Sequence, residues 1–388
     1  MSRIQQQLLK LEQQHRLRQR RVVSGLDGSR LSINGKSLLN FADNDYLGLR
    51  QHPQVIRACA EAAQQYGVGS GASALISGYS DQHQALEQEL EEFLGYQKVL
   101  LFSSGYLANQ AVMGSLCQRG DNIFSDQLNH ASLIDGCRLS RATVYRYSHS
   151  NSLKLVGLLQ QHATGKSAAN AGQENFILSD GVFSMDGDVA AYAELQQLAE
   201  RYNASLIIDD AHGVGVMGEY GRGSWEAVNA AKPDVLIGTL GKAFGTQGAY
   251  VAASSERIEW LVQKGRSYVY TTALAPPIAA ATRASLRLIC EGRKLRQQLS
   301  KNIAYFRQQA ITLGLELLPS ASPIQPLMLG SEQRLLDWAE KLQGAGILVG
   351  AIRPPTVPEG TSRLRITFNA IHQQAEIDQL LEALKEAA

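Results

Sequence analysis

Short apolar segments alternate with segments of helical apolar spacing from about residue 50 to residue 252, and this alternation constrains the fold more than any other feature. Each apolar segment has only four or five residues, a length typical of strands rather than helices. Strands separated by helices predict βαβ units, and therefore an α/β fold with a mostly parallel sheet covered by helices on both faces. The predicted strands are 99–102, 122–125, 144–147, 175–179, 205–209, 235–239 and 249–252.

The two ends of the chain have different patterns. Residues 2–21 are predicted to be helical because apolar residues recur at helical spacing, and residues 30–41 are predicted to form a hairpin that turns at Asn34-Gly35. After Pro276-Pro277 we predict a long helix over 278–313 and then a smaller α+β region. The predicted parts are an N-terminal helix and hairpin segment (1–46), a large α/β domain (47–286) and a small C-terminal α+β domain (287–388), with C-terminal strands at 315–318, 324–329, 347–351 and 363–368 and helices at 332–344 and from 374.

The bulk composition excludes several classes of function. The formal net charge is +1 and charged residues make up 19%, so we expect neither a nucleic acid nor an acidic membrane as partner. No apolar run has the length of a signal peptide or a membrane span, so we expect a cytoplasmic protein. The four cysteines have no spacing typical of metal or redox sites. The polar segment 163–174 is predicted to be a surface loop.

One lysine follows a buried strand in a turn of small residues. The sequence is Thr239-Leu-Gly-Lys242, and further glycines follow at Gly245 and Gly248. Burial lowers the pKa of an ammonium group, as imine chemistry requires, and small neighbours leave room for a flat ring. The alternative is an ordinary surface lysine in a loop, and the local sequence alone does not separate the two.

Two further strands end in groups that suit a phosphorylated aromatic cofactor. The strand 205–209 ends in Asp209-Asp210-Ala-His212, and an aspartate at that edge of a sheet could keep a pyridine nitrogen protonated. A metal site is the alternative, although the spacing does not match the common zinc arrangements. The strand 99–102 leads through Ser-Ser-Gly105-Tyr106 into a helix, whose N-terminus offers free N–H groups to a phosphate or is simply a capped turn.

The set of motifs, in this order, resembles the α-oxoamine synthases, which are fold-type I pyridoxal-phosphate enzymes. The resemblance extends from about Arg18 to the last helix and implies a central, mostly parallel, seven-stranded sheet, a smaller α+β C-terminal domain and a homodimer with shared active sites. Within the family, Ala351-Ile-Arg-Pro-Pro-Thr356 is most similar to the biotin-pathway branch. The motifs are Asn44-Asp-Tyr-Leu-Gly, Gly105-Tyr106, His130, Gly-Val-Phe-Ser184-Met-Asp-Gly, Asp209-Asp-Ala-His212-Gly and Thr239-Leu-Gly-Lys242.

The resemblance implies a role for each matching residue on the cofactor side. Lys242 would hold pyridoxal 5'-phosphate as a Schiff base, Asp209 would pair with the pyridine nitrogen, and His130 would stack on the ring and help to place the substrate. Ser184 and His212 would contact the side of the ring that carries the phenolic oxygen. The residues expected around the phosphate and its neighbouring ring are Gly105, Tyr106 and Thr239, with Thr271-Thr272 reaching the phosphate of the partner subunit.

The resemblance also implies the substrates, which are L-alanine and a pimeloyl thioester of coenzyme A or acyl carrier protein, joined with loss of CO2. Arg365 would bind the amino-acid carboxylate, Asn44 would belong to the substrate site, and Arg18 and Thr356 would meet the acyl substrate. This chain has Asp180 where the biotin-pathway branch often has glutamate. The alternatives are a glycine-using relative (glycine C-acetyltransferase or 5-aminolevulinate synthase), a cofactor-binding regulator without turnover, and a nicotinamide dehydrogenase. The last is disfavoured because no glycine fingerprint follows a strand.

Overall fold

The computed structural model describes residues 1–163 and 172–388. Most of the predicted surface loop at 163–174 therefore lies outside the described residues. The chain forms two compact units. The larger one comprises Leu49–Ser184 and Asp188–Arg296, and the smaller one comprises Met1–Gly48, Met185–Gly187 and Gln297–Ala388. The N-terminal segment and the C-terminal region thus belong to one compact unit, where the sequence suggested two separate segments.

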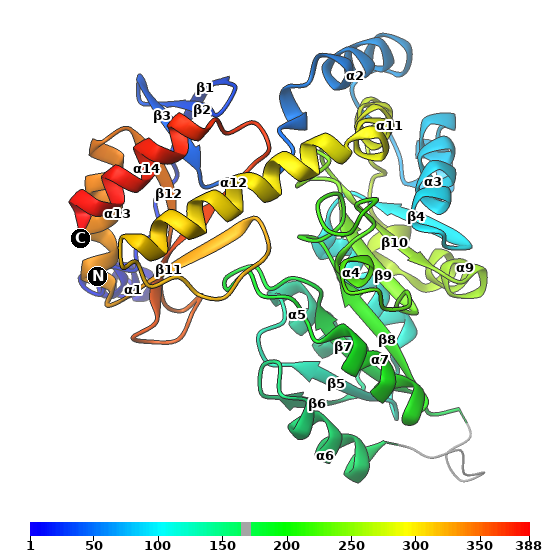
Figure 1. Cartoon of the computed structure of the whole chain (residues 1–388). Helices are drawn as coiled ribbons and strands as arrows, with labels where there is room; N and C mark the ends of the chain where they lie inside the picture. The colour runs from blue at the N-terminus through cyan, green and yellow to red at the C-terminus, as the bar shows by residue number, and fades with distance from the viewer. Residues whose placement is uncertain (164–171) are drawn as a thin grey trace. The chain divides into compact units, whose positions relative to one another are not determined.

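The larger unit is built on a seven-stranded sheet with the order β4-β10-β9-β8-β7-β5-β6 (Figure 1). The strands β9, β8, β7, β5 and β6 pair in parallel, and β10 is antiparallel to both of its neighbours, β4 and β9. The predicted mostly parallel sheet is confirmed, and each predicted strand is present to within one residue at either end. The strands are β4 (Lys98–Phe102), β5 (Asn122–Asp126), β6 (Thr143–Tyr147), β7 (Asn175–Asp180), β8 (Ala204–Asp209), β9 (Val235–Thr239) and β10 (Ala249–Ala253).

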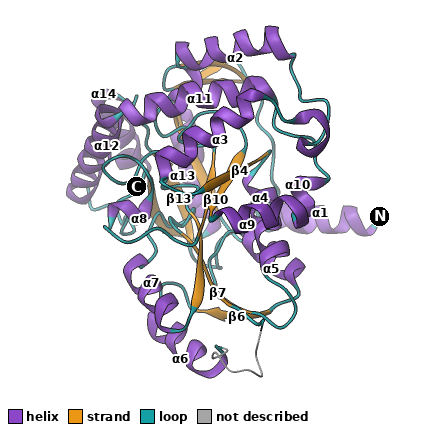
Figure 2. Cartoon of the chain, turned by 90° about the vertical axis from the view of Figure 1, so that its right-hand side faces the viewer, coloured by secondary structure: helices purple, strands orange, loops and turns teal. Residues whose placement is uncertain are grey.

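Helices cover both faces of this sheet (Figure 2). Alternate side chains of β8 point to opposite faces, so Ile207 packs in one hydrophobic cluster and Ile208 in the other. The first cluster includes side chains of α4 (Gly105–Leu116) and α9 (Ser255–Lys264), and the second includes side chains of α6 (Ser152–His162) and α7 (Tyr192–Arg201). The remaining helical elements are η1 (Leu49–Gln51), α2 (Pro53–Tyr66), η2 (Ala74–Gly78), α3 (Asp81–Leu94), α5 (Ala131–Ser140), α8 (Ser224–Ala227), α10 (Arg266–Val269) and α11 (Pro276–Glu291).

The smaller unit contains a six-stranded sheet with the order β1-β2-β3-β12-β13-β11. The predicted hairpin at 30–41 is present as β2 and β3, and β3 pairs in parallel with β12 from the other end of the chain. This pairing explains why the two ends of the sequence fold as one unit. The strands are β1 (Val23–Asp27), β2 (Arg30–Ile33), β3 (Lys36–Phe41), β11 (Ile324–Gly330), β12 (Ile347–Ile352) and β13 (Ser362–Thr367), and the helices include α1 (Arg3–Gln13), α13 (Glu332–Gly344) and α14 (Gln374–Ala387).

Three predicted elements differ from the structure. The N-terminal helix was predicted over 2–21 but ends at Gln13, because His15 takes a left-handed conformation (φ 56°) that the helix cannot continue through. The predicted helix over 278–313 is two helices, α11 and α12 (Arg293–Thr312), which are separated at Gly292. Residues 315–318 were predicted as a strand but contribute one isolated bridge, Leu317 to Leu327.

Candidate active site

The carboxyl ends of the parallel strands bring the predicted cofactor-side residues of the larger unit to one edge of the sheet. Asp180, the last residue of β7, is in register with Asp209, the last residue of β8. Lys242 follows β9 by three residues and His130 follows β5 by four. Because these strands run in parallel, the loops that follow them lie side by side, which is the usual place for a ligand in an α/β sheet.

Lys242 lies in a tight turn whose shape is set by backbone hydrogen bonds. The Gly245 N–H donates to the Lys242 carbonyl at 2.8 Å, and the Leu240 N–H donates to the Gly248 carbonyl at 2.9 Å. The Thr239 hydroxyl closes the base of the turn by donating to the same Gly248 carbonyl at 3.1 Å. The half-buried Lys242 amine lies 2.7 Å from Nε2 of His212. The lysine amine therefore lies beside His212, another residue that is predicted to contact the cofactor.

Asp209 is fixed by a residue that the sequence analysis did not identify. Its carboxylate is 8% exposed, and its Oδ2 accepts a hydrogen bond from Asn109 Nδ2 at 2.7 Å. The same Asn109 nitrogen donates to the Ser132 hydroxyl at 2.8 Å, and the Ala211 N–H donates to Asp209 Oδ1 at 3.1 Å. Asn109 lies one turn into α4, four residues after Gly105. Its spacing from the predicted phosphate-binding helix start was the one signal in the sequence that could have pointed to Asn109.

The adjacent Asp210 has a different environment. Its side chain is fully buried and accepts hydrogen bonds from the Ser224 N–H at 2.7 Å and the Ser224 hydroxyl at 2.9 Å. Glycines surround it, since a Cβ at Gly181, Gly213 or Gly223 would lie 2.2–2.4 Å from its carboxylate oxygens. Burial raises the pKa of Asp210 to about 7. Asp210 therefore packs against the segments that follow β7 and β8, whereas Asp209 is hydrogen-bonded to Asn109 of α4.

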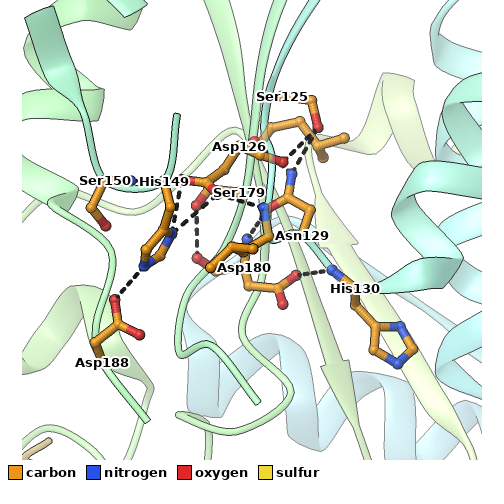
Figure 3. A network of polar contacts seen from close by, with 11 residues as sticks. Ser125, Asp126, Asn129, His130, His149, Ser150, Ser179, Asp180 and Asp188 are labelled. Atoms are coloured by element: carbon orange, nitrogen blue, oxygen red, sulfur yellow. Dashed lines mark hydrogen bonds and ion pairs between the residues drawn. The ribbon is translucent and has the colours of Figure 1, made fainter. Parts of the chain in front are cut away.

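His130 is oriented by two contacts at the start of α5. Its Nδ1 lies 2.6 Å from the Ser132 hydroxyl, and its backbone N–H donates to Asp180 Oδ1 at 3.2 Å (Figure 3). Partial burial lowers the pKa of the His130 imidazole and the nearby Lys242 ammonium lowers it further, against the opposing effect of Asp209. The neutral imidazole is therefore favoured, which suits a ring that stacks on another aromatic ring.

Asp180 is a buried acid whose carboxylate accepts the hydrogen bond from the His130 backbone. Burial, followed by the neighbouring Asp209 carboxylate, raises the pKa of Asp180 well above its usual range. Its backbone N–H donates to Asn129 Oδ1 at 2.9 Å, and Asn129 Nδ2 donates in turn to the Leu178 carbonyl and the Ser125 hydroxyl (Figure 3). The loop that carries His130 is thus hydrogen-bonded to the ends of both β5 and β7.

The start of α4 has the features of a phosphate site. The Ser104 hydroxyl caps the helix by accepting from the Leu107 N–H at 3.3 Å. A Cβ built on Gly105 would meet no atom within 4 Å, so the space beside this first residue of the helix is open. Tyr106 is 40% exposed, and its hydroxyl donates to Asp135 on α5. An open helix N-terminus, a buried carboxylate and a lysine amine at one sheet edge are the groups that pyridoxal phosphate requires.

The metal alternative receives no support from the part of the chain that the structure describes. Within residues 1–163 and 172–388, no group of three or more histidine, cysteine or acidic side chains is arranged to hold a metal ion. The Asp209, Asp210 and His212 side chains that suggested a metal site are directed to different partners, which are Asn109, Ser224 and Lys242.

The predicted substrate residues form two pairs within the smaller unit. Both terminal nitrogens of Arg365 donate to Asn44 Oδ1 at 3.2 Å, and the Arg365 side chain is 7% exposed. Arg18 Nη2 donates to the Thr356 hydroxyl at 3.1 Å. Residues that are more than 300 positions apart in the sequence are thus neighbours, as their shared assignment to a substrate site requires.

Comparisons with known proteins agree with this architecture. A family model described as aminotransferase class I and II matches residues 36–384. A solved structure of SPT with a pyridoxal-phosphate internal aldimine is 28% identical, covers 99% of this chain and 96% of its own, and superposes with a TM-score of 0.93. The fold and the site therefore define a fold-type I pyridoxal-phosphate enzyme, and the predicted fold class is confirmed.

More similar sequences narrow the class to one family. The 8-amino-7-oxononanoate synthase of Saccharophagus degradans is 48% identical and covers 99% of this chain and 96% of its own length. That of Cellvibrio japonicus is 49% identical, covering 96% and 92%. The solved 8-amino-7-oxononanoate synthase of Francisella tularensis is 32% identical, with a TM-score of 0.75, and covers 90% of this chain and 97% of its own. The chain belongs to the 8-amino-7-oxononanoate synthase family.

No described helix is both long enough and apolar enough to span a bilayer.

Proposed function

We propose that the protein catalyses the pyridoxal-phosphate-dependent condensation of L-alanine with a pimeloyl thioester, a step of biotin biosynthesis. The products are 8-amino-7-oxononanoate, CO2 and the free thiol of coenzyme A or acyl carrier protein. The observation that carries the proposal is the 48% identity to an 8-amino-7-oxononanoate synthase over 99% of the chain.

The residues at the sheet edge of the larger unit would hold the cofactor. Lys242 is the group for the Schiff base, the open N-terminus of α4 at Gly105 suits the phosphate, and Ser184, His212 and Thr239 would surround the ring and its substituents. Pyridoxal phosphate supplies an electron sink that stabilises negative charge on the α-carbon of a bound amino acid. Asp209 would keep the proton on the pyridine nitrogen, and Asn109 holds the Asp209 carboxylate in place through the 2.7 Å hydrogen bond.

Three basic side chains would act around the α-carbon of the bound amino acid. The amine of Lys242 is the general base that removes the α-proton of alanine and later returns a proton to the same carbon. The His212 imidazole, 2.7 Å away, would orient that amine. His130, in its neutral form, would stack on the ring and shield the reacting carbon from water.

The substrate ends would be bound by the residues of the smaller unit. Arg365, held by Asn44, would form paired hydrogen bonds with the alanine carboxylate until that group leaves as CO2. Arg18 and Thr356 would meet the acyl substrate, whose carbonyl carbon bonds to the alanine α-carbon as the carbon–sulfur bond breaks. A homodimer would complete each site, with Thr271-Thr272 of the partner subunit near the phosphate.

Identification of the product by mass tests this proposal. The holoenzyme is incubated with L-alanine and a pimeloyl thioester on each carrier, and in parallel with glycine and acetyl or succinyl thioesters. We expect 8-amino-7-oxononanoate, with one CO2 released from carboxyl-labelled alanine per thiol. Faster turnover with either glycine pair would contradict the assignment, and the Lys242→Ala variant is the control for background condensation.

A further inference from the structure

Another buried carboxylate, which has no predicted role at the cofactor, lies at the end of β5. Asp126 is 2% exposed, and its Oδ1 accepts from the Leu128 N–H at 2.8 Å while its Oδ2 accepts from the Ser150 N–H at 2.9 Å. The first donor lies in the loop that carries His130, and the second lies in the loop between β6 and α6. Asp126 therefore fixes two neighbouring loops at the carboxyl edge of the sheet.

His149 extends this network to a third loop (Figure 3). Its Nδ1 lies 3.1 Å from Asp126 Oδ1, and its Nε2 lies 2.9 Å from Asp188 Oδ2. The edge of the ring also meets the Phe183 ring, with the centroids 4.4 Å apart and the planes at 79°. Both ring nitrogens face a carboxylate oxygen, and an imidazole can donate to both only when it is protonated. The three residues form what we call the Asp126–His149–Asp188 bridge.

Asp188 closes the segment that carries Ser184. The Phe183 N–H donates to the Asp188 carbonyl at 3.0 Å, Val182 and Val189 form an antiparallel bridge, and the Ala190 N–H donates to the Gly181 carbonyl at 3.0 Å. Residues 181–190 are therefore a short hairpin-like segment. Ser184 lies inside it, one residue beyond Phe183, which is the residue that the His149 ring contacts.

The tip of this segment has separate contacts. Met185–Gly187 belong to the smaller unit, where Asp186 pairs with Arg363. Ser184 is thus the last residue of the larger unit before the tip, and Asp188 is the first residue after it. At this return point, the Asp188 side chain attaches the segment to His149 of the larger unit at 2.9 Å.

We propose that His149 is a positioning residue for the reaction: by bridging Asp126 and Asp188 it holds the segment 181–190, and through it the Ser184 hydroxyl, at the carboxyl edge of the sheet. The inference rests on the proposed function because it assigns Ser184 to the phenolic-oxygen side of the cofactor. His149 itself touches neither cofactor nor substrate in this role.

The affinity for the cofactor and the pH midpoint of its visible absorbance test the proposal. We expect His149→Gln to weaken retention of pyridoxal phosphate by the holoenzyme about 10-fold, because a charge-assisted hydrogen bond that fixes the segment is lost. We expect it to shift the absorbance midpoint in the same direction as Ser184→Ala. The double variant His149→Gln/Ser184→Ala should shift the midpoint no further than Ser184→Ala alone, since both changes act through one contact.

Two further variants separate positioning from general stability. Asp188→Asn removes the negative charge from the same contact on the other side and serves if His149→Gln does not fold. His162→Gln removes a half-buried imidazole that stacks on Tyr145 (centroids 4.1 Å apart) in the same unit without touching the segment. We expect Asp188→Asn to reproduce the midpoint shift and His162→Gln to leave it unchanged.

An unchanged midpoint and cofactor affinity in His149→Gln or Asp188→Asn, with only a lower unfolding temperature, would overturn the proposal, as would additive shifts in the double variant. Turnover of L-alanine with pimeloyl thioester by the wild-type enzyme is measured alongside. If the wild-type enzyme does not turn over these substrates, the proposed substrates are refuted. The comparison of cofactor affinity and absorbance between the variants still tests the role of His149.

Discussion

The protonation of His149 should make the stability of the larger unit depend on pH in a defined direction. Burial alone would lower the pKa of this imidazole, but the hydrogen bonds and charges of Asp126 and Asp188 outweigh burial and raise the pKa to about 9. The unfolded-state value is about 6.5. The folded state therefore binds the proton more tightly than the unfolded state, and the resulting stabilisation is complete below about pH 6.5 and lost as the pH rises through about 9.

The magnitude follows from the size of the pKa shift. A shift from about 6.5 to about 9 corresponds to about 3 kcal/mol at 1.36 kcal/mol per unit. The side chain of His149 is 20% exposed, so screening by solvent reduces this figure to about 2 kcal/mol. For a unit of this size, about 2 kcal/mol corresponds to a change of roughly 5 °C in the unfolding temperature.

Thermal unfolding of the wild type and of His149→Gln between pH 6 and pH 10 measures the effect. We expect the wild type to unfold roughly 5 °C higher at pH 6 and the two proteins to converge above about pH 9, because only the wild type loses a proton from this bridge. His162→Gln should follow the wild-type pH profile with a constant offset. A His149→Gln deficit that stays constant from pH 6 to pH 10 would refute the cationic bridge.

Three other predictions concern further substitutions. Asp209→Asn should abolish turnover while the protein still folds, whereas Asp210→Asn should lower the unfolding temperature more than it lowers kcat; the reverse order in paired thermal and kinetic measurements would contradict the division of roles between them. Gly213→Ala should destabilise the fold by about 3 kcal/mol, because its Cβ would lie 2.2 Å from Asp210 Oδ1, whereas Gly69→Ala, which meets nothing within 4 Å, should change the unfolding temperature little. Lys242→Ala should remove the visible absorbance that survives gel filtration in the wild type; a retained, covalently bound chromophore would show that another residue holds the cofactor.

The strands of the larger unit could be predicted from the sequence because each strand has its own local apolar pattern. Each strand is a short apolar run between polar turns, and each run appears as a strand in the structure. The helix ends were harder to predict. Apolar residues recur at helical spacing in the N-terminal segment, yet α1 buries none of its residues, so no packing continues the helix past Gln13. Gly292 separates α11 from α12, although the apolar pattern of the two helices together is typical of one long helix.

The site was predictable only where a residue follows a strand end. Lys242, Asp209 and His130 could be placed together because parallel strands share a carboxyl edge. Asn109 and His149 could not, since Asn109 reaches the site across 100 positions of sequence and His149 meets Asp188 across 39. Periodicity gives the face of an element on which a side chain lies, but it does not give the partner on another element. Such partners emerge only when the helices and loops are packed.

The same packing explains how three neighbouring carboxyl groups can lie at adjacent strand ends. Asp180, Asp209 and Asp210 are all at most 8% exposed, and three buried negative charges at this spacing would repel one another strongly. The pKa of Asp210 is raised to about 7 and that of Asp180 well above its usual range, in each case by burial first and by Asp209 in addition. Asp180 and Asp210 can therefore carry protons near neutral pH. Protonation of Asp180 and Asp210 lowers the negative charge around Asp209, whose side chain Asn109 holds at 2.7 Å. An aspartate fixed in this way is suited to pair with a protonated pyridine nitrogen.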